Sequence, residues 1–361
     1  MDYTHLGRSG VSVSRIVLGT MNFGAATSED DAHQIMDRAH ESGINFFDTS
    51  NTYGQPRAEG VTEQIIGNWF SAGRGRRDRT VLATKVYGGR GEWPNDRYLS
   101  AVQIRRACDD SLRRLRTDHI DLYQMHHVDR SVPWEEIWSA LDLLYSQGKI
   151  IYTGSSNFAG WHIAQAQEAA LRRHSLGLVS EQSLYNLAQR SAELEVLPAC
   201  QAYGVGVICW SPLHGGLLAG GLLAEMPVGP EHTTRPGAGQ PAGQRARQQA
   251  LQETGQPAGR QAGQEIGRRA GGRAAEELPR RRPQIEAYEA FCADLGEAPA
   301  AVALAWLLHR RGVTGPIVGP RTINQFDAAL RATEITVGGK ELARLDEIFP
   351  GPGPAPEAYA W

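Results

Sequence analysis

Short stretches of β-branched and aromatic residues alternate with longer helical patterns from residue 15 to the end of this chain. The pattern predicts eight strands, at Arg15–Gly19, Asn45–Asp48, Val81–Thr84, Asp121–Gln124, Ile151–Gly154, Leu178–Glu181, Val205–Trp210 and Gly315–Val318. Strands that alternate with helices form a parallel sheet, and eight of them close into a barrel. We therefore predict an α/β fold, a single (β/α)8 barrel of parallel strands over residues 1–361, with a hairpin at its N-terminus.

Three of the helices between these strands have recognisable ends. Ser28 and Ser100 stand where a hydroxyl caps the first turn of a helix, and Pro133 stands where a proline fits the first turn. The helix after Pro133 is expected to end at Gly148.

Residues 225–283 interrupt the alternation. Between Pro227 and Pro283 the sequence is mostly Gly, Pro, Gln, Ala and Arg, and residues 231–283 contain 10 Arg and 5 Glu. Such a composition buries too little apolar surface to offset the entropy of ordering, so we predict a flexible insertion after the seventh strand. It is either a solvated loop or a basic flap over an anionic ligand. Helical patterning resumes at Ile285.

Charge and cysteine content limit the classes of partner. The formal net charge is −3, which does not favour nucleic acid or a membrane surface as a partner. The first residues lack the basic and apolar regions of a signal peptide, and the apolar runs are too short to span a bilayer. The four cysteines are scattered without a Cys-x-x-Cys pair. We expect a cytoplasmic protein with reduced thiols and no metal, acting on a small molecule.

Polar residues stand where three successive strands end. Asp48 ends the second predicted strand with Tyr53 five residues later, Lys85 directly follows Thr84 at the end of the third, and His126 follows the fourth. In a βα barrel, catalytic groups come from these strand ends and the loops after them. The four side chains are therefore predicted to meet at one rim.

Together these four groups suit the reduction of a carbonyl. Hydride delivery to the carbonyl carbon requires a proton for the oxygen, and the phenol of Tyr53 is a reluctant donor on its own. The ammonium of Lys85 favours the phenolate, and the carboxylate of Asp48 keeps that ammonium charged. A neutral imidazole at His126 donates a hydrogen bond to the carbonyl oxygen.

Three further residues are candidates for contact with a substrate. His127 competes with His126 for the polarising role, although strand alternation is expected to direct the two rings to opposite sides. Tyr87 and Trp93 follow the third strand, where aromatic rings can stack on a sugar or a base. The alternative is an ordinary loop rim on a reductase of broad range.

Several motifs, in the order of the chain, resemble the signatures of the aldo-keto reductase family. The resemblance covers the chain except for about residues 225–283. The motifs are Asp48-x4-Tyr53-Gly54, Thr84-Lys85, Asp121-Leu122-Tyr123-Gln124-Met125-His126, Gly154-Ser155-Ser156-Asn157-Phe158, Trp210-Ser211-Pro212-Leu213, and Ile317-Val318-Gly319-Pro320-Arg321 followed by Gln325.

The resemblance implies a TIM barrel that uses NADPH, with Asp48, Tyr53, Lys85 and His126 as its catalytic tetrad. It also implies which residues contact the cofactor. Those implied at the nicotinamide are Ser156, Asn157, Gln182 and Trp210, those along the phosphates are Ser211, Leu213, Gly319, Arg321 and Gln325, and those of the first loop are Gly19, Thr20 and Met21.

Two departures from the family pattern bear on cofactor affinity and phosphate preference. Leu218-Ala219-Gly220-Gly221 stands where many relatives have a lysine, and Asp327-Ala328-Ala329 stands where they often have an acid–Asn pair. Three functions remain open at this point. The first is an NADPH-dependent reductase of aldehydes or ketones. The others are a reductase of a nucleotide-linked keto-deoxysugar in natural-product biosynthesis and a cofactor-sensing regulatory subunit, as the potassium-channel β subunits are.

Overall fold

The computed structural model describes residues 1–56, 59–89, 91, 93–225 and 258–360. For residues 224–225 and 258–273 it describes the backbone alone.

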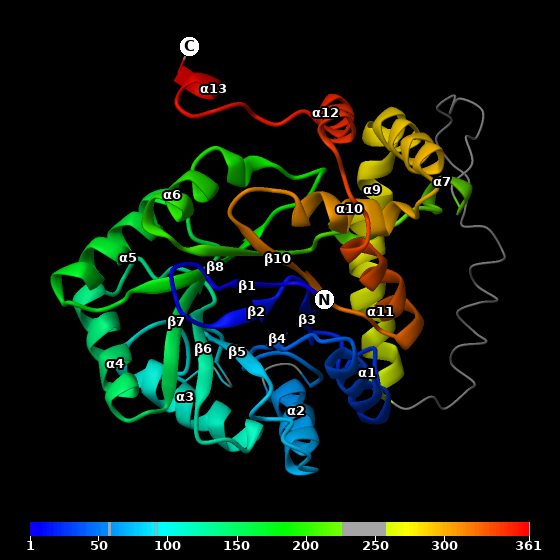
Figure 1. Ribbon diagram of the computed structural model, residues 1–361. Helices are drawn as coiled ribbons and strands as arrows, with labels where there is room; N and C mark the ends of the chain where they lie inside the picture. Colours follow the sequence, from blue (N-terminus) through cyan, green and yellow to red (C-terminus); the bar gives the residue numbers. More distant parts are fainter. Residues whose placement is uncertain (57–58, 90, 92, 226–257, 361) are drawn as a thin grey trace, which may run out of the picture.

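Eight parallel strands form a closed barrel in the order β10-β3-β4-β5-β6-β7-β8-β9, with helices around it (Figure 1). Each strand overlaps one that the sequence predicts, so the prediction of an α/β barrel is confirmed. The largest difference is in β8, which continues three residues past Glu181 to Leu184, and β5 continues two residues past Thr84. The strands are β3 Val17–Gly19, β4 Phe46–Asp48, β5 Val81–Val86, β6 Ile120–Met125, β7 Ile150–Ser156, β8 Leu178–Leu184, β9 Gly206–Trp210 and β10 Val313–Val318.

An antiparallel hairpin, β1 Tyr3–His5 with β2 Ser12–Ser14, precedes the barrel, as predicted. Its turn lies against the start of β9, because a Cβ built on Gly7 would be 2.7 Å from the nitrogen of Gly206. Leu6 and Val13 are fully buried and belong to the cluster of apolar side chains inside the barrel. The hairpin therefore closes the end of the barrel opposite the carboxyl ends of the strands.

The helix ends follow the signals in the sequence. The hydroxyls of Ser28 and Ser100 accept the backbone N–H groups of Asp31 and Gln103, and α4 begins directly after Pro133. The helices are α1 Glu29–Glu41, α2 Val61–Ser71, α3 Ala101–Leu115, α4 Trp134–Ser146, α5 Gly160–Arg172, α6 Val196–Tyr203, α7 Leu222–Glu225, α9 Ala258–Leu295, α10 Pro299–Leu308, α11 Ile323–Leu330, α12 Gly339–Ile348 and α13 Glu357–Ala360, with short 3₁₀ turns η1 Ser191–Glu193, η2 His214–Gly216 and η3 Arg331–Thr333.

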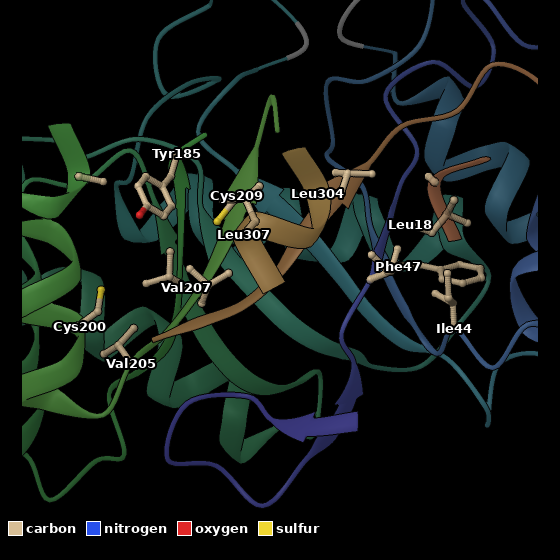
Figure 2. Close-up of a cluster of buried hydrophobic side chains, with 14 of the residues drawn as sticks. Leu18, Ile44, Phe47, Tyr185, Cys200, Val205, Val207, Cys209, Leu304 and Leu307 are labelled. Atoms are coloured by element: carbon tan, nitrogen blue, oxygen red, sulfur yellow. The ribbon is translucent and has the colours of Figure 1, made fainter. Parts of the chain in front are cut away.

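The main core lies between the barrel and its helices. Figure 2 shows Val207 and Cys209 of β9 close to Leu307 of α10, and all three are fully buried. Helix α10 is apolar around most of its circumference, as expected for a helix covered on both sides. This packing holds β9 and β10, whose carboxyl ends lead into two of the loops implied to bind a cofactor.

The prediction of a flexible segment up to Pro283 is wrong for its last part. Helix α9 begins at Ala258, and Figure 1 shows it as a long helix on the same side of the barrel as α10 and α12. Ala274 and Leu278 are each only 1% exposed, and Ile285 continues the same buried stripe. Because these apolar residues are widely spaced among Arg, Glu and Gly, composition alone hides the stripe. Residues 226–257 of the predicted insertion lie outside the described residues.

Within the described part of the chain, no single helix has the length and apolar character to cross a membrane. One pair, Ala274–Leu295 and Pro299–Leu308, meets the length and composition criteria together, but the two helices meet at an angle of 88°. Cys108, Cys200, Cys209 and Cys292 are all buried free thiols.

Candidate active site

The four residues of the predicted tetrad lie at the carboxyl ends of adjacent strands. Asp48 is the last residue of β4, Lys85 lies near the end of β5, and His126 directly follows β6. Tyr53 lies in the loop after β4, where Gly54 adopts a positive φ of 94°. A Cβ on Gly54 would lie 2.8 Å from Val61, so a glycine lets this loop turn closely against α2.

Lys85 is fully buried and donates three hydrogen bonds. Its Nζ lies 2.6 Å from Oδ2 of Asp48, 2.8 Å from the carbonyl oxygen of Thr49 and 3.2 Å from the hydroxyl oxygen of Tyr53. A lysine donates three hydrogen bonds only as an ammonium. The phenol oxygen thus accepts from Lys85, and its own proton is free to be donated in another direction.

Burial and charge act in opposite directions on the two groups that share this contact. Burial lowers the pKa of Lys85, but Asp48 and Tyr53 raise it, and the net result is a pKa above the ordinary value. Burial raises the pKa of Tyr53, Lys85 lowers it and Asp48 raises it, and the net pKa is raised. The lysine therefore favours the phenolate, as the sequence predicts, but burial outweighs it and keeps the phenol protonated.

Asp48 is held from the side away from Lys85 by two amides. Its Oδ1 accepts from Nε2 of Gln182 at 2.8 Å and from Nε2 of Gln124 at 3.0 Å. The family resemblance implies a cofactor role for Gln182 and no role for Gln124. Gln124 stands two residues after Leu122, which belongs to the cluster inside the barrel, so alternation along β6 directs its side chain inward as well.

His126 lies beside the phenol of Tyr53, with ring centroids 6.0 Å apart and planes at 80°. Its Nδ1 is 3.4 Å from the hydroxyl oxygen of Ser50. The prediction that His127 turns to the opposite side is wrong, since the two imidazoles stack at 5.0 Å with planes 4° apart. Strand β6 ends at Met125, so strand alternation does not extend to His126 and His127.

The candidate substrate residues differ in how close they lie to the tetrad and in how exposed they are. Tyr87 is half-buried, and its ring meets the exposed imidazole of His127 edge-on at a centroid distance of 5.1 Å. On its other side Tyr87 contacts the ring of Tyr98 at 5.2 Å. Trp93 is 78% exposed, so the structure does not place it in a buried site. Tyr87 and His127 thus extend the active-site rim next to His126.

A second polar cluster joins the ends of β7, β8 and β9. The Ser156 hydroxyl donates to the carbonyl oxygen of Gln182 at 2.9 Å. Asn157 has a positive φ of 61°, and its Nδ2 donates to Oγ of Ser156 at 3.0 Å and to the carbonyl oxygen of His126 at 3.2 Å. The indole of Trp210 donates to Oδ1 of Asn157 at 3.1 Å. The residues implied at the nicotinamide are therefore one connected network beside the tetrad.

Two loops carry the residues implied along the phosphates. Ser211 has a positive φ of 52°, its carbonyl oxygen accepts from Asn186 at 2.9 Å, and Leu213 is partly buried. Arg321 is exposed just before α11, and its backbone N–H donates to Oε1 of Gln325 at 2.9 Å.

The first loop, after β3, contacts both Asp48 at the end of β4 and the residues that follow β10. A Cβ on Gly19 would lie 2.6 Å from the side chain of Ile317, so only glycine fits there. The Thr20 hydroxyl donates to the carbonyl oxygen of Asp48 at 2.9 Å, and Met21 is 48% exposed. Further along the same loop, Asn22 donates to the carbonyl oxygen of Gly319 at 2.7 Å.

The donors in these clusters fit a dinucleotide better than a metal. Amide and hydroxyl groups beside the tetrad suit a carboxamide, and an exposed guanidinium at the start of α11 suits a phosphate. Among the residues that the structure describes, no group of three or more His, Cys, Asp or Glu side chains is placed to hold a metal ion.

Comparisons with known proteins identify one matching family and several similar chains. The family model described as "Aldo/keto reductase family" matches residues 15–349. The chain is 46% identical to the uncharacterized oxidoreductase YrpG of Bacillus subtilis (strain 168) over 366 aligned residues, which cover 100% of both chains. It is 30% identical to versiconal hemiacetal acetate reductase of Aspergillus parasiticus over 97% of both chains. It is 35% identical to a probable voltage-gated potassium channel subunit beta of Oryza sativa subsp. japonica, over 61% of this chain and 66% of that one.

Proposed function

The chain belongs to the aldo/keto reductase family of oxidoreductases, and from this premise we propose that it reduces an aldehyde or ketone with NADPH. Tyr53 is the general acid in this proposal. The observation that carries it is the hydrogen bonding of Lys85, whose three donors are all used and one of which ends on the phenol oxygen.

A bound nicotinamide supplies the hydride that forms the new C–H bond at the carbonyl carbon. The chain's own residues handle the oxygen. The imidazole of His126 donates a hydrogen bond to it, and the hydroxyl of Tyr53 gives it a proton, which leaves an alcohol and a phenolate. Lys85, 3.2 Å from the phenol oxygen, stabilises that phenolate, and Asp48 stabilises the ammonium of Lys85.

The residues that hold the cofactor in this proposal are those of the two polar clusters. Ser156, Asn157 and Gln182 would hold the carboxamide, and the half-buried indole of Trp210 would pack against the nicotinamide. Arg321, exposed at the start of α11, binds the phosphate that distinguishes NADPH from NADH.

The substrate is a small carbonyl compound bound at the rim formed by His126, His127 and Tyr87. The flat faces of these rings also suit a nucleotide-linked keto-deoxysugar, which is the more specific alternative.

The four cysteines are buried, free thiols, which supports a reducing, cytoplasmic setting for the protein.

A regulatory role is the second candidate, because a potassium channel subunit beta is 35% identical to part of the chain. The two candidates differ in turnover. The purified protein is mixed with NADPH and a simple aldehyde, and the absorbance of NADPH is followed with time. Continuous oxidation that depends on the aldehyde supports the reductase. Binding of NADPH without oxidation, over a panel of aldehydes and ketones, supports the sensor.

A further inference from the structure

Glu181 is a fully buried carboxylate that lies outside the tetrad. It is paired with Ser155 in the β7–β8 ladder, one residue before the pair of Ser156 with Gln182. Gln182 faces into the barrel toward Asp48. Because side chains alternate along a strand, Glu181 points away from the barrel interior.

Three donors converge on this carboxylate. The hydroxyls of Ser155 and Ser183 donate to it at 2.5 and 2.8 Å, and the backbone N–H of Phe158 donates at 3.1 Å. Burial raises the pKa of Glu181 to about 7, although the hydrogen bonds lower it. Among the described residues, the buried thiol of Cys200 on α6 is a titratable neighbour that interacts with it electrostatically. The group is therefore held by neutral hydrogen-bond donors.

The donors stand on both sides of the polar cluster. Ser156 and Asn157 form a turn at the end of β7, with Ser155 before it and Phe158 after it. Glu181 accepts a hydrogen bond from each of these two flanking residues. Within that turn Asn157 has a positive φ of 61°, in the left-handed region that a non-glycine residue keeps only when surrounding contacts stabilise it. In that conformation its side chain reaches Trp210 on one side and the His126 backbone on the other.

We propose that Glu181 positions the turn that carries Asn157, and through that turn the nicotinamide-binding side of the active site. The inference rests on the function proposed above. Glu181 faces the opposite side of β8 from Gln182, so it acts through the turn rather than by touching the reacting groups. Removing it leaves two hydroxyls and one N–H without their buried acceptor, and the turn then loses the contacts that select its conformation.

The first experiment compares Glu181→Ala with Glu181→Gln in the full chain. We expect Glu181→Ala to raise the Kd for NADPH at least tenfold and to change kcat less than threefold when NADPH is saturating. Glu181→Gln restores most of the affinity, because its amide oxygen still accepts from Phe158 and Ser183. The control is Glu193→Ala, which removes a different carboxylate, partly buried and bound to Arg190 and Arg310. It is expected to lower stability without changing the Kd.

A second readout needs no cofactor. In ¹H–¹⁵N spectra of the free protein, the indole N–H of Trp210, assigned with Trp210→Phe, is expected to shift in Glu181→Ala because its bond to Asn157 weakens. If Glu181→Ala does not fold, Ser155→Ala/Ser183→Ala replaces it and is expected to raise the Kd severalfold. A folded variant with a Kd within twofold of wild type and an unshifted indole signal overturns the inference. Failure of the wild type to bind NADPH contradicts the proposed function instead.

Discussion

Replacing Glu181 with glutamine should make the free energy of unfolding less sensitive to rising pH. Burial raises the pKa of Glu181 from an ordinary value of 4.5 to about 7 in the folded protein. The folded state therefore retains a proton that the unfolded chain has lost between these two values. A group of this kind contributes stability below pH 4.5 that is lost as the pH rises through 7.

The size of the effect follows from the two pKa values. Each pKa unit corresponds to about 1.4 kcal/mol, so the whole range from 4.5 to 7 corresponds to about 3 kcal/mol. Between roughly pH 5 and pH 8.5, about 2–3 kcal/mol of this is lost. Glutamine has the same shape and does not titrate, so Glu181→Gln is free of the loss.

The assay is equilibrium unfolding in urea at a series of pH values for both proteins. All other titrating groups are shared, so the difference between the two free energies of unfolding isolates Glu181. We expect Glu181→Gln to gain about 2–3 kcal/mol on wild type between roughly pH 5 and pH 8.5, with most of the gain below pH 7. A difference that stays constant with pH, or that changes in favour of wild type, refutes the reasoning.

Three other substitutions test separate parts of the structure. Arg321→Ala should weaken NADPH by about 1–3 kcal/mol and NADH much less, because a charged hydrogen bond to the extra phosphate is lost; equal losses in a titration remove Arg321 from that role. Gln124→Leu should lower kcat roughly tenfold without changing the Kd for NADPH, because one of the two amides that donate to Asp48 is lost. An unchanged kcat shows that Gln182 alone suffices to hold Asp48 in place. Leu278→Ala should cost about 2–5 kcal/mol of unfolding free energy, against almost nothing for the exposed Glu276→Ala; equal stabilities contradict the packing of α9.

The sequence was most informative where a local pattern and the fold agree. The eight strands are short and bounded by Gly, Pro and polar residues, and each was located within a few residues. The contact of Lys85 with Asp48 and Tyr53 was predicted because parallel strands bring their carboxyl ends to one rim. In these cases a side chain's position follows from its place on a strand.

The sequence was less informative where position depends on tertiary contacts. His127 stacks on His126 because the strand ends before both residues, and the end of a strand is the least certain feature of a pattern. The buried stripe of α9, at Ala274, Leu278 and Ile285, is sparse, and only packing against the barrel makes it visible. The roles of Gln124 and Glu181 depend on tertiary hydrogen bonds, to Asp48 for the amide and from Ser155 and Phe158 for the carboxylate.

The central claim is that Tyr53 donates the proton, and Tyr53→Phe tests it most directly. In a single turnover with saturating NADPH and aldehyde, the rate of NADPH oxidation is measured by stopped flow. A deuterated nicotinamide shows by its isotope effect that hydride transfer limits the rate. We expect the variant to bind NADPH as wild type does and to lose on the order of 10²–10⁴ in rate, the usual contribution of a general acid. A variant that retains more than about a tenth of the wild-type rate, with the chemical step still limiting, contradicts the claim.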